Sequence, residues 1–122
     1  LERIKGSINS YTMDRLAQTA AVAALKDQGY FRETCERIIS TREKAMQQLK
    51  DLGFSGPESM TNFVFVTHEK VPAAQIYEEL KQAGIFVRYF AKPRIDNYLR
   101  ITIGTPAEMD RLIEQLDRIV KR

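Results

Sequence analysis

The first part of the chain repeats its apolar residues every three or four positions, which is the spacing of an amphipathic helix. Over residues 12–28 the repeated apolar positions are rich in alanine, and the pattern ends before Gly29. The positions on one face are Met13, Leu16, Ala17, Ala20 and Ala24. Residues 31–52 have the same spacing up to Gly53, with Phe31, Cys35, Ile38, Ala45, Leu49 and Leu52 on one face. The pattern predicts two leading helices.

The second half of the chain alternates short β-rich runs with helical stretches. After a predicted turn at residues 54–57, the β-rich runs occupy residues 62–66, 85–90 and 98–103. A helix is expected to open at Pro72 and to close at Gly84. A last helix begins at Thr105, where Thr105, Pro106 and Glu108 form a capping box. Its apolar face consists of Met109, Leu112, Ile113, Leu116, Ile119 and Val120.

This order of elements predicts an α/β (α+β) fold. A right-handed crossover makes the first two strands parallel, and the third can lie between them, antiparallel to both. We therefore expect two leading helices and then a β-α-β-β-α small domain, whose three-stranded mixed sheet is covered on one face by helices. The expected boundaries are a helical segment over residues 1–29, a long connecting helix over 30–53 and the small domain over 54–122.

Composition narrows the classes of protein that remain. The 122 residues are 43% hydrophobic and 29% charged, which is typical of a soluble globular domain, and the mildly basic net charge of +3 leaves both anionic small molecules and nucleic acid open as ligands. Cys35 is the single cysteine, so neither an internal disulfide nor a zinc site is expected, and a cytoplasmic location fits. Because residues 1–4 contain no Met and no secretory signal, we expect a processed chain or a piece of a longer one.

Two arginines interrupt the apolar pattern of the last two strands. Arg88 shares a strand face with Phe86 and Phe90, and Arg100 shares one with Tyr98 and Thr102. In a hairpin without a bulge, positions 88 and 100 lie on the same face. Like charges on facing strands destabilise the pair unless an anion lies between them, and guanidinium groups suit phosphate or carboxylate.

Other readings of the same residues stay open at this point. The two arginines can reach into solvent, or they can pair with Asp96 or Glu58. His68 is expected in a surface turn rather than in catalysis, and Cys35 is expected to be a buried, inert thiol. The aromatic run at residues 62–66 is expected to be a core strand, because the lead-in typical of RNA-recognition modules is absent.

Four segments resemble the histidinol-phosphate aminotransferases, a family of fold-type I pyridoxal-phosphate enzymes. They are NSYTMDRLAQ at 9–18, NFVFV at 62–66, GIFVRYF at 84–90 and, above all, YLRITIGT at 98–105. The resemblance implies the C-terminal part of such an enzyme: residues 1–29 from its large domain, then the connecting helix and the small domain. Enzymes that act on aromatic amino acids or on cobalamin precursors share parts of this pattern.

The resemblance also implies a reaction and a site. Histidinol phosphate and 2-oxoglutarate would exchange an amino group in histidine biosynthesis, with pyridoxal phosphate as the electron sink, in a cytoplasmic homodimer. Arg100 would bind the anionic end of each substrate in turn, and Arg88 would assist at the phosphate. Lys92 and Arg94, in the hairpin loop, are not assigned a role.

The residues that hold the cofactor in this family, including the Schiff-base lysine in its Ser-x-x-Lys context, lie upstream of Leu1 in the resemblance. The chain alone is therefore expected to be inactive, with no catalytic, cofactor-binding or metal-binding residue of its own. The alternative from the residues themselves is a stand-alone β-α-β-β-α module that binds a phosphorylated ligand or RNA through Arg88 and Arg100.

Overall fold

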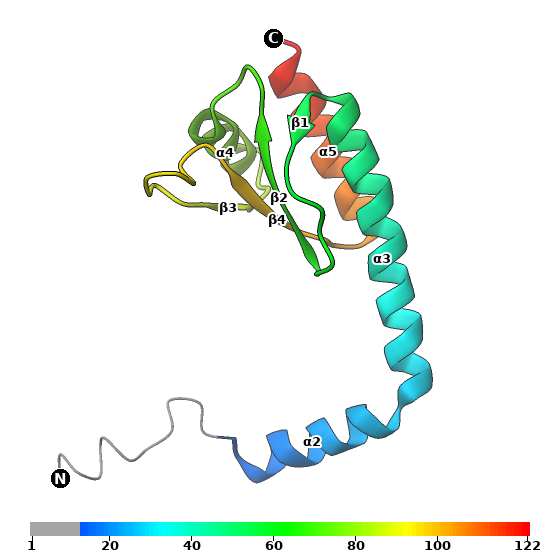
Figure 1. Ribbon diagram of the computed structural model, residues 1–122. Helices are drawn as coiled ribbons and strands as arrows, with labels where there is room; N and C mark the ends of the chain where they lie inside the picture. The colour runs from blue at the N-terminus through cyan, green and yellow to red at the C-terminus, as the bar shows by residue number, and fades with distance from the viewer. Residues whose placement is uncertain (1–12) are drawn as a thin grey trace, which may run out of the picture. The chain divides into compact units, whose positions relative to one another are not determined.

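A computed structural model describes residues 13–122 (Figure 1). The expected helix start at Thr12 and the resembling residues 9–12 lie outside this range. The chain divides into two compact units, Leu1–Cys35 and Glu36–Arg122. In chain order, the elements are α2 (Arg15–Lys26), α3 (Gln28–Asp51), β1 (Phe54–Ser55), β2 (Phe63–His68), α4 (Ala73–Gln82), β3 (Arg88–Tyr89), β4 (Leu99–Thr102) and α5 (Pro106–Val120).

The two leading helices are separated at Asp27, two residues before the glycine that the sequence indicated. Asp14 caps α2, because its carboxylate accepts the backbone N–H of Ala17 at 2.8 Å. The Asp27 carboxylate accepts the N–H of Tyr30 at 3.1 Å and so supports the first turn of α3. None of the residues of α2 is buried within the described chain.

The sheet has four strands in the order β1-β2-β4-β3, and every hydrogen-bonded pair is antiparallel. The predicted three-stranded mixed sheet is therefore wrong in strand number and in the term mixed, because no two neighbouring strands are parallel. The extra strand is β1, which the sequence indicated as a turn and which pairs Phe54 with His68 at the end of β2. The last strand, β4, lies between β2 and β3 and runs antiparallel to both, which confirms that part of the prediction.

The strand expected over residues 85–90 is observed only at Arg88–Tyr89. The end of α4 accounts for the absence of Ile85 from the strand, because the N–H of Ile85 donates to the carbonyl of Leu80 at 2.9 Å and that of Gly84 donates to Lys81 at 3.1 Å. Gly84 has a φ of 73°, the left-handed conformation that this type of helix end requires. The first residue of the run thus completes the helix and does not enter the sheet.

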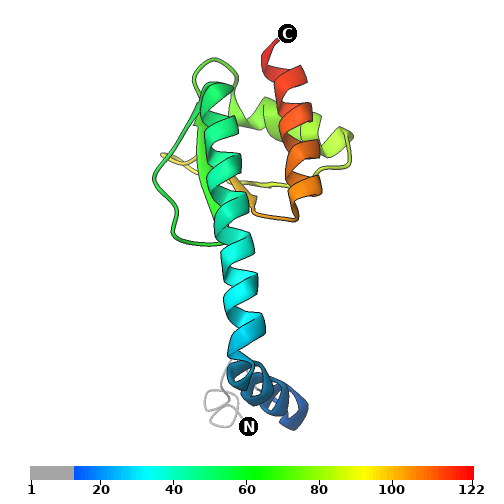
Figure 2. The same ribbon diagram turned by 90° about the vertical axis from the view of Figure 1, so that its right-hand side faces the viewer.

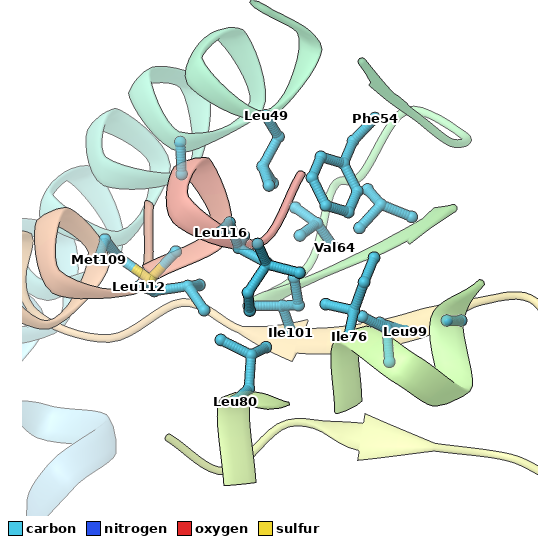
Figure 3. Packing of buried hydrophobic residues seen from close by; sticks show 14 of the residues in the cluster. Leu49, Phe54, Val64, Ile76, Leu80, Leu99, Ile101, Met109, Leu112 and Leu116 are labelled. Atoms are coloured by element: carbon cyan, nitrogen blue, oxygen red, sulfur yellow. The ribbon is translucent and has the colours of Figure 1, made fainter. Parts of the chain in front are cut away.

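One face of the sheet is covered by α4, α5 and the later turns of α3. In Figure 3, Leu49 of α3, Ile76 of α4 and Leu116 of α5 converge on side chains of the central strands. The largest side chains that are less than 2% exposed are Leu49, Ile76, Leu80, Leu99, Ile101, Leu116, Val64 and Val66. Burial of each such side chain contributes about 1.5–3 kcal/mol, so this apolar layer is the main source of stability of residues 36–122.

Polar contacts fix the helices around this layer. In Figures 1 and 2, α3 and α5 lie side by side, and Lys44 pairs with Asp110 across them at 2.7 Å. The capping box predicted at α5 is present: Thr105 donates its N–H to Glu108 at 2.7 Å, and its hydroxyl accepts the N–H of Glu108. The Thr105 hydroxyl also donates to the Glu108 carboxylate, at 2.8 Å. The N–H and the hydroxyl of Thr105 together hold the pKa of the Glu108 carboxyl below its ordinary value of 4.5, with the backbone N–H as the larger cause.

The start of α4 is capped from a distant loop. Pro72 stands at the cap position and offers no side-chain hydrogen bond. The side-chain oxygen of Asn97 accepts the N–H of Ala73 at 2.9 Å, while its amide nitrogen donates to the hydroxyl of Thr67 at 3.1 Å. Asn97 thereby ties the loop between β3 and β4 to the end of β2 and to α4.

Candidate functional site

The face of the sheet opposite the helices presents aromatic and cationic side chains. Residues alternate between the two faces along each strand, so Phe63 and Phe65 of β2 share this face with Arg100 of β4 and Arg88 of β3. The two arginines are exposed and the two phenylalanines are half-buried. We call these four residues, together with Phe90 and Tyr98, the open face.

Arg88 and Arg100 are direct partners across the β3–β4 pair. The sequence placed these two positions on the same face, and the register confirms that placement. Side chains directly opposite each other on antiparallel strands have Cβ atoms only about 5 Å apart, where two like charges are unfavourable. A bound anion between the two guanidinium groups would remove that repulsion.

Within residues 13–122, neither arginine has an acidic partner. The ion pairs of this range involve Lys44, Lys70, Lys81, Arg118, Lys121 and Arg122. The alternative in which Arg88 or Arg100 pairs with Asp96 or Glu58 is therefore not observed. Two adjacent, exposed guanidinium groups offer ten N–H donors in all, with the geometry that phosphate and carboxylate oxygens accept.

Aromatic rings surround the arginine pair. The guanidinium carbon of Arg100 lies 5.4 Å from the centre of the Phe63 ring and 6.0 Å from that of Phe90, while that of Arg88 lies 5.4 Å from Phe90. Phe65 stacks on Tyr98 with ring centres 4.7 Å apart. The sequence interpretation of residues 62–66 as a core strand missed this, although the alternation of Phe with Val in that run signals two different faces.

His68 is buried, which corrects its assignment to a surface turn. Its Nε2 lies 2.9 Å from the carbonyl oxygen of Leu52, and its Nδ1 accepts the backbone N–H groups of Lys70 at 3.2 Å and Val71 at 3.0 Å. A neutral ring that carries its proton on Nε2 satisfies all three contacts. His68 thus joins the end of α3 to the end of β2, and its role is structural.

The remaining candidates lie apart from the open face or contribute less. Cys35 is a free thiol and is half-buried, not fully buried as expected. Lys92 and Arg94 are exposed in the loop after β3, and Arg94 has a φ of 76°, a conformation that side chains other than glycine rarely adopt. Over residues 13–122 there is no cluster of three His, Cys, Asp or Glu side chains suited to a metal ion. Nor does this range contain a helix with the length and apolarity of a membrane span.

The chain matches known aminotransferases along nearly its whole length. It is 48% identical over 121 residues to histidinol-phosphate aminotransferase 1 of Oceanobacillus iheyensis and 55% identical over 116 residues to that of Clostridium beijerinckii. These matches cover 99% and 95% of this chain, but only 34% and 32% of the relatives. The chain therefore spans about a third of the length of each relative.

Solved structures share its fold. The histidinol-phosphate aminotransferase of Sinorhizobium meliloti in complex with pyridoxal-5'-phosphate matches with a TM-score of 0.82 at 31% identity, over 98% of this chain and 33% of that one. The Clostridium acetobutylicum enzyme matches with the same TM-score at 22% identity, over 98% of this chain and 37% of that one. At this low identity, the match is evidence for the fold only. The family model of class I and II aminotransferases matches residues 1–116, so the chain belongs to the class I and II aminotransferase family.

Proposed function

We propose that this chain is the C-terminal part of a pyridoxal-phosphate-dependent histidinol-phosphate aminotransferase and that its open face binds the anionic ends of the substrates. The observation that carries the proposal is the pair of facing arginines, Arg88 and Arg100, which have no acidic partner within residues 13–122. The family membership and the relatives named above support the choice of reaction.

In this proposal the two substrates use the arginines in turn. Arg100 and Arg88 together bind the phosphate of histidinol phosphate, and Arg100 then binds a carboxylate of glutamate or 2-oxoglutarate. Charge-assisted, bidentate hydrogen bonds orient each substrate without taking part in bond making. The reaction belongs to histidine biosynthesis, and the enzyme works as a cytoplasmic homodimer.

The strands of the open face do not fit the role of attaching the cofactor. A lysine is needed for the covalent attachment of pyridoxal phosphate, and the strand residues of the open face include none. We propose that the rest of the enzyme supplies the lysine and the phosphate site of the cofactor. This chain then contributes to binding and orientation of the substrate.

The exposed apolar side chains of the first unit support the proposal that this chain is part of a larger protein. Leu16 and Leu25 of α2 are 83% and 73% exposed, and Tyr30 is 69% exposed. Apolar surface of this kind is commonly covered by another part of the protein. We propose that residues 1–29 belong to the large domain, that residues 30–53 form the connecting helix and that residues 54–122 form the small domain.

The main test is Arg100→Ala in the full-length enzyme. A lost charge-assisted contact costs about 1.5–3 kcal/mol, so kcat/KM should fall roughly 10- to 150-fold for both substrates. The cofactor should remain bound, as judged by its visible absorbance. Arg88→Ala should lower kcat/KM mainly for histidinol phosphate. Unchanged turnover in both variants would contradict the proposal.

A second test uses the 122-residue chain by itself. Mixed with pyridoxal phosphate, it should give no absorbance of an internal Schiff base and no transamination. Reduction with borohydride should leave no stable adduct at a defined lysine. A stoichiometric adduct at one lysine would show that this chain carries its own cofactor site.

The alternative, a stand-alone module for RNA, draws on the same open face, because single-stranded RNA is bound by stacking on aromatic side chains and by arginine contacts. It predicts binding of a single-stranded oligonucleotide that weakens steeply as the salt concentration rises. The aminotransferase proposal predicts no useful affinity at physiological ionic strength. A fluorescence-anisotropy titration at two salt concentrations separates the two functions.

A further inference from the structure

Phe90 makes more contacts with the arginine pair than any other ring described in residues 13–122. Its ring centre lies 5.4 Å from the guanidinium carbon of Arg88 and 6.0 Å from that of Arg100. Phe63, by contrast, contacts Arg100 alone, at 5.4 Å. Arg100 therefore has two rings beside it, whereas Arg88 has one, and Phe90 is common to both arginines.

A ring beside a guanidinium group affects how readily an anion binds there. A free arginine side chain samples many rotamers and loses this freedom when an anion fixes it. Cation–π attraction restrains the group before the ligand arrives, which lowers the entropy lost on binding. The contact uses none of the N–H donors in hydrogen bonds, so all of them stay free for an anion.

The ring also offsets the repulsion between the two arginines. Arg88 and Arg100 are direct partners across β3 and β4, where like charges are unfavourable. The negative face of an aromatic ring attracts both cations. Phe90 thus favours the arrangement in which the two guanidinium groups lie close enough to share one anion.

We infer that Phe90 is a positioning residue that orders Arg88 and Arg100 together, whereas Phe63 orders Arg100 alone. This inference rests on the proposed function, in which a phosphate uses both arginines and a carboxylate uses Arg100. Phe90 then determines specificity, because a ligand held by both arginines depends on this ring more than a ligand held by Arg100.

The experiment is to measure kcat/KM for each half-reaction of the full-length enzyme, since two substrates that use one site in turn report on it independently. Phe90→Leu should lower kcat/KM for histidinol phosphate roughly two- to fivefold, which is the range of an exposed cation–π contact, and should lower that for 2-oxoglutarate less. Phe63→Leu should lower both half-reactions to a similar extent.

Two further variants separate positioning from packing. Phe90→Tyr keeps an aromatic face and should restore kcat/KM for histidinol phosphate. Phe86→Leu is the matched control, because it makes the same substitution two residues before Arg88. The Phe86 side chain is 81% exposed, and the arginine contacts within residues 13–122 are made by Phe63 and Phe90 instead. Both half-reactions should be unchanged in this control.

The outcomes distinguish this inference from the proposed function. If Phe90→Leu lowers both half-reactions equally, or lowers neither, while Arg88→Ala and Arg100→Ala act as expected, then the inference about Phe90 is wrong and the proposed function stands. If the arginine variants themselves leave both half-reactions unchanged, the proposed function fails. A selective loss with histidinol phosphate, recovered by Phe90→Tyr, supports the inference.

Discussion

The two faces of the sheet are built from neighbouring residues of the same strands, yet they differ in nearly every property. On the covered face, Leu99 and Ile101 are at most 2% exposed and pack among aliphatic side chains of three helices. On the open face, Arg100 stands between them in sequence and points its charge away from that core. Strand alternation thus places the residues that stabilise the fold one position away from the residues of the proposed ligand site.

The largest expected effect is a difference in the free energy of unfolding between two variants at neighbouring positions, one on each face of the sheet. Ile101→Ala removes buried methyl and methylene groups and should lower the free energy of unfolding by about 2–5 kcal/mol. Arg100→Ala, one residue earlier, should change it by no more than about 0.5 kcal/mol, because the side chain is exposed. Urea unfolding of the 122-residue chain measures both. Equal losses would show that the open face also supports the fold.

The second prediction concerns the polar group within the covered face. His68→Phe keeps a ring beside Phe54 but leaves the carbonyl of Leu52 and the N–H of Val71 without their partner. The expected loss is about 1–3 kcal/mol in the free energy of unfolding. Thr102→Val is the control: it removes an exposed hydroxyl from the partner of Phe63 in β4, on the side of the sheet away from the helices, and should be near neutral. A stable His68→Phe variant would show that packing alone fixes this corner.

A third substitution on the open face should raise the stability of the chain and weaken the proposed substrate binding. Arg88→Glu places opposite charges directly across the β3–β4 pair and should raise the free energy of unfolding by about 0.2–1 kcal/mol. The same change should abolish the preference for a phosphorylated substrate in the full-length enzyme. Arg88→Gln, which removes the like charge without adding an opposite one, should lie between the two in stability. A less stable Arg88→Glu chain would mean that the guanidinium groups do not repel each other.

The smallest expected effect is a dependence on pH at the start of α5. Hydrogen bonds from Thr105 lower the pKa of Glu108, so the folded chain binds this proton less readily than the unfolded chain. The contribution to stability is present above the ordinary pKa of 4.5 and is lost as the pH falls through the lowered value. The urea midpoint should fall less steeply in Glu108→Gln than in the unmodified chain between about pH 6 and about pH 3. Parallel curves would contradict this assignment.

Features set by local sequence could be predicted, because helix periodicity, capping and strand parity need only neighbouring residues. The capping box at Thr105 and the shared face of Arg88 and Arg100 are examples. The two-residue strand β1 could not be predicted, since it exists through its pairing with β2. His68 was misjudged for the same reason: its burial depends on the end of α3, which lies 16 positions earlier in the chain.

In the candidate site, too, some features follow from local sequence and others depend on contacts between strands. Its charges follow from the alternation of residues within each strand, which the sequence displays directly. The contacts of Phe90 with both arginines depend on how side chains reach diagonally across neighbouring strands, and no local pattern encodes that. Sequence reasoning therefore identified the arginines for which we propose anion binding, but not the ring that we infer to position them.

The two outer strands of the sheet, β1 and β3, are each only two residues long. Unpaired backbone groups at the edge of a sheet can recruit a strand from another molecule, which leads to aggregation, and very short outer strands leave few such groups. The helix ending takes the N–H of Ile85 into a bond with Leu80 of α4 and so keeps Ile85 out of β3. The same local hydrogen bond that ends α4 therefore also leaves one backbone group fewer for edge-to-edge pairing with another molecule.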